Sequence, residues 1–425
     1  MTGSHRDADP AAPRQRSSGG ARGLMASGAP IAAVLSIIGL LVVAAGTFAL
    51  TTGDLPLPNT GGGGGPAASG GGGGGGPIKT PTPSGVVIVP TEAPGITVPG
   101  TLVYAKDGNI WTQTSEQATQ LTTAGTDSMP SFSADGQFVY FVRTRPIKGI
   151  WNVLGVPRKY AMDVPSLMRV PTAGGDPVPL LDGIYDPGGP SKWMGWIREP
   201  VVSPDGRSIA LLTDLPNPTS GFVVLKFFNM QTKKLMDPQV AQVPPLGHQD
   251  PAWRPDGKLL AYVMNNRNGS VGAPQIYAYS PLNGVSKPIT APGYLHPSWS
   301  PDGRYLAATK TSAYGTDVVI LNASTGAEVV RLTSDGDSWA PAWSPAGDQV
   351  AFLHVAGQVV DLRMVPLTGT GPSWTVGDPV DLTSSAGLDG VSRPDWFVPA
   401  DQMPAVSPAP SAASPTDPGA SPSPS

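Results

Sequence analysis

The sequence contains no cysteine in its 425 residues. This absence excludes disulfide bonds, thiolate metal sites and cysteine nucleophiles. It also excludes attachment of a lipid through a cysteine side chain. If the protein is exported, it must be held at the membrane by a helix of its own.

Charged residues are scarce, at 14%, and the formal net charge is −4. Domains that bind nucleic acids usually carry a clear excess of lysine and arginine, because they neutralise phosphates. We therefore expect no nucleic-acid partner.

The common catalytic signatures are also missing. The sequence has no G-x-S-x-G, no H-E-x-x-H and no phosphate-binding glycine loop, and its glycines at 61–76 form a low-complexity run. The stretch SDGDSW at 334–339 lacks the ligand spacing of a calcium loop. We predict no enzymatic activity, no metal and no cofactor, although a site assembled from several repeats would leave no such motif.

One apolar run, residues 30–50, carries no charge and has the length that spans a bilayer. Four arginines precede it and no lysine or arginine follows until Lys79, a bias that keeps the amino terminus in the cytoplasm. Its length favours a signal anchor (30–51) over a cleaved signal sequence. We predict a single-pass protein of the cell membrane, with a disordered cytoplasmic segment at 1–29 and an extracytoplasmic remainder.

Two low-complexity segments frame the rest of the chain. Residues 52–100 are rich in glycine and proline, which predicts a flexible linker. Residues 400–425 are rich in proline, serine and alanine, which predicts a disordered tail. A folded domain is expected at 101–399.

A short unit repeats within that domain, as in HPSWSPDGRYLAA from His296. Its proline recurs at intervals of 44 to 70 residues, at Pro130, Pro200, Pro251, Pro297, Pro341 and Pro394. This period is typical of four-stranded propeller blades. Within each copy, Pro-Asp-Gly predicts a tight turn between two strands.

The first and last copies are each incomplete. The copy at Arg393 ends after one strand, whereas residues 101–122 supply three strands with no first strand before them. Pairing the strand of Trp396 with residues 101–105 would complete one blade from both chain ends. The prediction is an all-β, six-bladed propeller with non-covalent ring closure.

The P-x-W-S-P-D-G signature resembles the TolB-like propeller family. It is also similar to the propellers of tricorn protease and of prolyl-oligopeptidase-type peptidases, without their hydrolase domain. The resemblance implies an envelope binding partner, a substrate gate or part of an envelope assembly. Two copies depart from the signature, with Ala134 in place of the turn proline and Ala346 in place of the turn aspartate, and we expect only local effects.

Two long loops, residues 144–165 and 183–198, should emerge side by side on one face of the propeller. They carry aromatic and cationic candidates for a partner face: Trp151, Arg158, Lys159, Tyr160, Lys192, Trp193 and Trp196. Such a mixture on loops of a rigid scaffold suits recognition. Alternatively, the tryptophans fold under their own loops as a small local core.

A second candidate site lies at the mouth of the central channel. Residues that precede the repeated prolines should form a ring there, with further side chains close by: Glu199, Asp250, His296 and Arg393, with His248, Tyr294 and Trp339. We expect no particular side chain to be required by the fold at these positions, so their diversity would suit a polar small ligand. The alternative is a water-filled entrance with ordinary polar residues.

Three functions follow in order of preference. The first is a binding or scaffold module for a cell-envelope protein or an anionic wall polymer. The second is a hydrolase or lyase on wall glycans, with Glu199 and Asp250 as acid and base. The third is a ligand sensor.

Overall fold

A computed structural model describes residues 88–90 and 97–403. Within this range it leaves out 187, 189–191, 219–222, 239, 242–246, 266–272, 400 and the side chains of 88–90 and 151–153. The predicted cytoplasmic segment, the signal anchor, most of the linker and nearly all of the tail lie outside these residues. No helix in the described part is long and apolar enough to cross a membrane.

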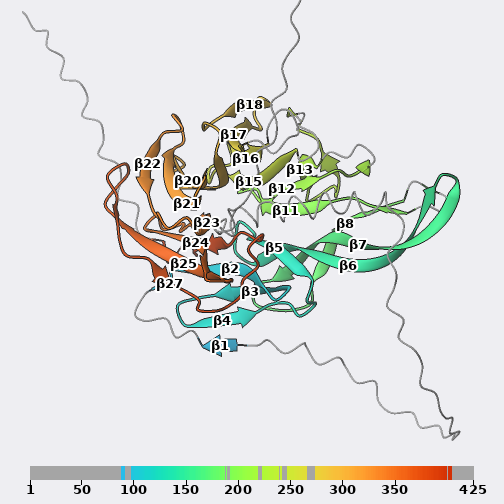
Figure 1. The fold of residues 1–425 in the computed structure, drawn as a ribbon, viewed down its shortest axis with the longest axis horizontal. Coiled ribbons are helices and arrows are strands. Elements are labelled where there is room, and N and C mark those ends of the chain that lie inside the picture. Colours follow the sequence, from blue (N-terminus) through green and yellow to red (C-terminus); the bar gives the residue numbers. More distant parts are fainter. Residues whose placement is uncertain are drawn as a thin grey trace, which may run out of the picture.

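Apart from a short pair formed by β9 (Ile184–Tyr185) and β10 (Trp193–Met194), the described strands form six antiparallel sheets arranged as blades around one axis (Figure 1). Blade 1 contains β5 (Asp127–Phe132), β6 (Phe138–Val153), β7 (Val156–Pro171) and β8 (Val178–Asp182). Blade 2 contains β11 (Ile197–Val202), β12 (Ser208–Thr213), β13 (Val224–Asn229) and β14 (Leu235–Met236). Blade 3 contains β15 (His248–Trp253), β16 (Leu260–Met264), β17 (Gln275–Ser280) and β18 (Val285–Pro288).

The other three blades complete the ring. Blade 4 contains β19 (Tyr294–Trp299), β20 (Tyr305–Ser312), β21 (Gly315–Asn322) and β22 (Glu328–Arg331). Blade 5 contains β23 (Ser338–Trp343), β24 (Gln349–Ala356), β25 (Val359–Thr368), β26 (Thr375–Val376) and β27 (Val380–Asp381). Blade 6 contains β28 (Asp395–Phe397), β2 (Thr101–Lys106), β3 (Asn109–Gln113), β4 (Gln117–Gln120) and β1 (Ile88–Pro90).

Blade 6 confirms the predicted closure of the ring. Strand β28 pairs with β2, and Trp396 lies opposite Leu102. The indole of Trp396 also donates a hydrogen bond to the carbonyl of Pro99, at 2.7 Å. The two chain ends are therefore joined by backbone pairing and by a buried tryptophan.

The repeated Ser-Pro-Asp-Gly turns owe their stability to their own side chains. In blade 4, Ser300 donates to Asp302 at 2.6 Å, and Asp302 accepts the amide of Arg304 at 3.0 Å. Gly303 has a φ of +67°, a backbone conformation that glycine adopts without strain. The turn at Ala346 keeps its closing bond from Gly347 to Ser344, so the departure there is local, as expected.

The hydrophobic core lies between neighbouring blades. One cluster joins Tyr140 and Leu167 of blade 1 to Ile209 and Phe228 of blade 2. Because each blade covers its neighbour's apolar face, the sheets must repeat and close to exclude water.

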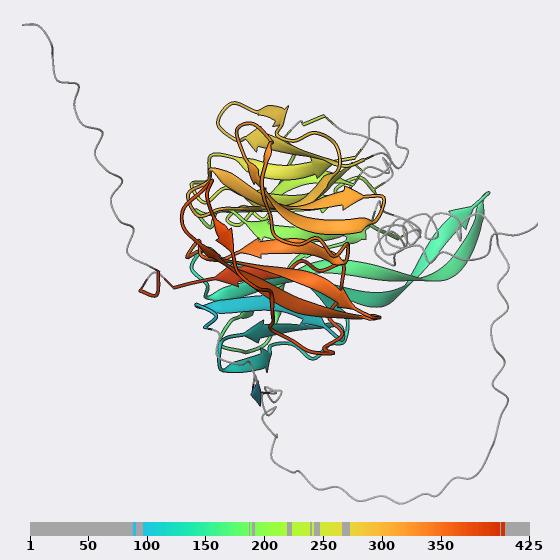
Figure 2. The ribbon, with the colours of Figure 1, turned by 60° about the vertical axis from the view of Figure 1, so that its left-hand side comes forward.

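The expectation of a loop at residues 144–165 is wrong. Strands β6 and β7 continue past the blade as a two-stranded ribbon, paired from Phe138 and Pro171 to Val153 and Val156. This ribbon, which we call the arm, projects well beyond the disc (Figure 2). Its apex is a tight turn at Leu154 and Gly155, which have φ values of +51° and +82°.

Candidate functional site: the insertion face and the central channel

The two faces of the propeller differ in their connections. Links from second to third strands, and links between blades, emerge on one side, which we call the insertion face. The Pro-Asp-Gly turns lie on the other side, the turn face. The arm and residues 183–198 both belong to the insertion face.

The structure brings the two insertions into contact. The amide of Lys192 donates to the carbonyl of Ile150 at 3.3 Å, and the hydroxyl of Tyr160 donates to the carbonyl of Lys192. Beside them, β9 (Ile184–Tyr185) pairs with β10 (Trp193–Met194). The second insertion therefore supports the outer part of the arm, close to its apex.

The candidate aromatic residues are neither fully buried nor fully exposed. Tyr160, Trp193 and Trp196 are each half-buried. The amide of Trp196 donates to Asp214 at 2.7 Å, which fixes the chain where it enters blade 2. The side chain of Trp151 lies outside the described part of the chain, and the choice between a partner face and a small local core stays open.

The cations of the arm differ in how they are paired. Arg145 pairs with Asp182, and Lys192 lies 3.4 Å from Asp186. Arg158 and Lys159 are exposed, and neither forms an ion pair within the described part of the chain. The outer arm thus carries positive charge that no acidic side chain offsets.

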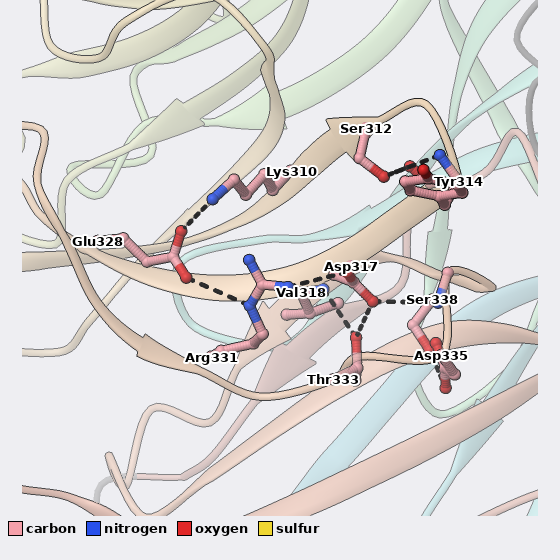
Figure 3. Close-up of polar contacts among 12 residues, drawn as sticks. Lys310, Ser312, Tyr314, Asp317, Val318, Glu328, Arg331, Thr333, Asp335 and Ser338 are labelled. Atoms are coloured by element: carbon pink, nitrogen blue, oxygen red, sulfur yellow. Dashed lines mark hydrogen bonds and ion pairs between the residues drawn. The ribbon is translucent and has the colours of Figure 1, made fainter.

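Blade 4 provides a contrast on the same face (Figure 3). Lys310 pairs with Glu328, which also lies 3.3 Å from Arg331, and Arg331 in turn lies 3.4 Å from Asp317. This blade neutralises its own charges. The same is true of Arg143 in blade 1, which forms two hydrogen bonds with the buried Asp127.

In the channel, the residues that precede the prolines have an unusual backbone. Met129, Glu199, Asp250, His296 and Ala340 all have φ between +49° and +55°. Each lies where the register of the first strand shifts against the second. This bulge turns the side chain toward the next blade.

Hydrogen bonds between blades follow from this geometry. Glu199 accepts the amide of Asp250 at 2.6 Å, and Asp250 accepts the amide of His296 at 3.0 Å. The hydroxyl of Thr309 lies 3.0 Å from the ring of His296 and accepts the amide of Ala340. The expectation that the fold needs no particular side chain here is therefore wrong, because these side chains link successive blades.

Arg393 crosses the channel. Its guanidinium donates to the carbonyl of Pro251 at 2.8 Å and to that of Pro297 at 3.3 Å, in blades 3 and 4. Burial and the neighbouring charge of Asp250 raise the pKa of Glu199, although Arg198 and Arg393 oppose this shift. Burial lowers the pKa of His296. The arginine therefore supplies the positive charge among these buried acidic groups.

The three residues expected near the mouth have structural contacts. His248 is buried, accepts the amide of Leu225 at 3.0 Å through Nδ1 and donates to the carbonyl of Ala241 through Nε2. The indole of buried Trp339 donates to the carbonyl of Gly390, and Tyr294 packs against the core of blades 3 and 4. A ligand role for these residues stays a prediction.

A cavity of about 190 Å³ lies on the turn-face side of this ring. Its lining includes Trp253, Trp299, Trp343, Arg393 and Asp395. The sequence prediction missed the three tryptophans as lining residues, although their recurrence two residues after the proline was the available signal. No group of three or more potential metal ligands occurs among the described residues.

Comparison with known proteins agrees with this architecture. Residues 191–373 match the family model of the TolB beta propeller domain. TolB from Acinetobacter baumannii superimposes with a TM-score of 0.50 at 17% identity, over 70% of this chain and 66% of that one. A protein assigned as TolB from Agrobacterium tumefaciens gives a TM-score of 0.48 at 17% identity, over 72% and 95%.

An oligogalacturonate lyase from Vibrio parahaemolyticus gives a TM-score of 0.38 at 13% identity, over 72% of this chain and 100% of that one. No curated protein matches the sequence significantly. At these identities, the structural likeness concerns the fold alone. The described part of this chain is therefore a six-bladed β-propeller, and its residues 191–373 are similar to the TolB beta propeller domain.

Proposed function

We propose that this protein is a membrane-anchored, extracytoplasmic propeller that binds or scaffolds a cell-envelope partner through its insertion face. The observation that carries the proposal is the arm with its supporting insertion. It places Arg158 and Lys159, which form no ion pair within the described residues, away from the disc. Exposed polar features on a rigid scaffold are typical of recognition.

The charge of this surface indicates an anionic partner, either an acidic envelope protein or an anionic wall polymer. The chain as a whole is acidic, with a net charge of −4, so a cationic arm concentrates positive potential on one part of the surface. Attraction of this kind raises association rates and weakens with salt.

The anchored topology rests on the sequence. The uncharged run at 30–50 and the arginines before it support an amino terminus in the cytoplasm. Protease added to intact cells should then degrade the propeller and spare an amino-terminal tag. Degradation of the tag with an intact propeller would reverse the proposed orientation.

We do not put forward the glycan-directed enzyme or the ligand sensor. Glu199 and Asp250, the candidate acid and base, each accept a hydrogen bond from a backbone amide of the next blade. These bonds link successive blades of the ring. No contact of the described residues favours a sensor.

The binding proposal is tested by replacing Arg158, Lys159 and Lys192 with alanine. A matched control replaces Arg207, Lys258 and Arg304, exposed cations of the turn face, and so removes the same charge. Capture of envelope components should fall for the first variant at low salt and persist for the control. Equal capture by both variants across a salt titration would remove the insertion face as the binding surface.

A further inference from the structure

The apex of the arm exposes apolar side chains to an unusual degree. Leu154 is 99% exposed and Val156 is 57% exposed, whereas leucine and valine elsewhere in this propeller are mostly buried. Ile150, which is half-buried, lies at the same end of the ribbon. Large apolar residues that gather at one exposed position mark an interaction site.

The charged residues within the apex segment all have one sign, although Asp186 and Asp163 lie nearby. Residues 147–161 include Lys148, Arg158 and Lys159 and contain no aspartate or glutamate. All three cations are exposed, and none forms an ion pair within the described residues. The apex therefore combines an apolar tip with a basic collar.

The ribbon that carries the apex lacks the support of a full sheet. Strand β8 pairs with β7 only as far as Ser166, so no third strand pairs with the ribbon beyond this point in the described chain. Two-stranded ribbons are marginally stable in water on their own. The second insertion contacts the outer arm at Ile150 and Tyr160, but no described segment covers the tip at Leu154 and Val156, which favours a role for this tip.

We propose that the apex of the arm, residues 147–161, docks on the surface of a bilayer that contains anionic lipids. Leu154 and Val156 would enter the headgroup region, and Lys148, Arg158 and Lys159 would contact the lipid phosphates. The inference rests on the membrane-anchored topology proposed above and names a binding surface for the outer arm.

The shape of the apex favours a lipid surface over a protein groove. The tight turn at Leu154 and Gly155 is convex, and its most exposed group is aliphatic. A bilayer interface can deform around a protrusion of this kind, and its anionic headgroups complement a basic collar. A protein partner would need a preformed apolar pocket with an acidic rim.

The predicted distances permit simultaneous anchoring and docking. Because β1 already belongs to blade 6, the predicted linker is shortened to residues 52–87, and a flexible chain of that length has a root-mean-square end-to-end distance of about 30 Å. The arm from Arg145 to Leu154 adds about 30 Å at the usual rise of a strand. The linker would therefore keep the arm within reach of the bilayer, which raises the effective concentration of lipid at the tip.

The absence of native cysteine makes a direct test simple. The full chain with Leu154→Cys is labelled with an environment-sensitive nitrobenzoxadiazole dye and reconstituted in vesicles with or without phosphatidylglycerol. Tyr314→Cys is the matched control, because Tyr314 is 86% exposed at the apex of the β20–β21 hairpin on the same face. Leu282→Cys, at a residue 94% exposed on the turn face, is a second control.

The dye at position 154 should emit at shorter wavelength in phosphatidylglycerol vesicles and be quenched by brominated lipid, with no change at either control position. Alanine at Arg158 and Lys159 should weaken the lipid response about five-fold per cation. An unchanged spectrum at position 154 in every vesicle would overturn the proposal. So would an equal response at Tyr314→Cys, or a response in lipid-free detergent that grows with protein concentration, which would assign the tip to a second copy.

These vesicles contain no other envelope component, so the result is independent of the binding proposal. If the dye at position 154 shows no spectral shift in vesicles while the protein still captures an envelope partner, lipid docking alone is overturned. A clear response with no partner capture would leave lipid docking standing and remove the partner.

Discussion

His248 was a candidate ligand residue, yet both of its ring nitrogens serve the backbone. Nδ1 accepts the amide of Leu225, and Nε2 donates to the carbonyl of Ala241. Its ring also packs edge-on against Tyr262, with centroids 4.9 Å apart. Burial lowers its pKa to about 4, so the folded protein holds a neutral imidazole near pH 7.

His248→Ala should therefore destabilise the protein by roughly 2–4 kcal/mol, because two buried backbone groups lose their partners. His248→Asn, which keeps an acceptor for the amide of Leu225, should lose less. In the parent protein, this histidine should make stability fall as the pH drops from about 6.5 toward 4, because the unfolded state binds the proton more tightly. Thermal unfolding of the three proteins at several pH values checks this, and an alanine variant as stable as the parent would contradict it.

The ionisation of Glu199 should change stability with pH in the direction opposite to that of His248. Its folded pKa is raised by burial and by Asp250, so the folded state binds the proton more tightly than the unfolded state. Glu199→Gln keeps an acceptor for the amide of Asp250 but cannot ionise. Its melting temperature relative to the parent should be highest near pH 7 and should decline as the pH falls toward 4.5. A difference that stays constant with pH would rule out the raised pKa.

Some residue conformations could be predicted from the repeat and others could not. The Ser-Pro-Asp-Gly turns follow from local chemistry, since serine, aspartate and glycine each have a defined role in a tight turn. The left-handed backbone at Glu199, Asp250 and His296 could not be predicted, because it depends on a bulge against the second strand and on acceptors in the next blade. The polar identity of these residues was visible, but their use in linking blades was not.

At the scale of elements, the arm is an addition that the blade does not require. Replacing residues 148–161 with Asn-Gly keeps the Ile147–Met162 pair and closes the ribbon with a favoured two-residue turn. The melting temperature should change by less than about 4 °C, since the removed segment buries little of the core. Lipid docking and partner capture should both be lost. A large loss of stability would show that the arm belongs to the fold.

The repeat predicted the strands, the turns and the ring closure, because each depends on a pattern that recurs. The arm was missed because Pro146, Pro157 and Pro165 argue against strands. A two-stranded ribbon tolerates them, since each strand has an outer edge where an amide need not pair with a neighbour. These prolines therefore argue against a central strand of a sheet, but they are compatible with the strands of a two-stranded ribbon.

At the scale of the whole molecule, the fold follows from the sequence more readily than the function does. Six similar units determine a propeller, whereas the binding surface that we propose depends on one arm and one collar of three cations. The net charge of −4 gives no indication of this collar, because the charges of blade 4 and of Arg143 are neutralised locally and those of the outer arm are not.

We propose that the insertion face, in the intact envelope, is the surface that contacts the partner. A photo-crosslinking amino acid placed at Arg158 or Trp193 in living cells, with Arg304 on the turn face as the control, tests it most directly. Crosslinks to an envelope component should form at Arg158 and Trp193, decrease at high salt, and be absent at Arg304. Crosslinks confined to Arg304, or equal at all three positions, would contradict the account.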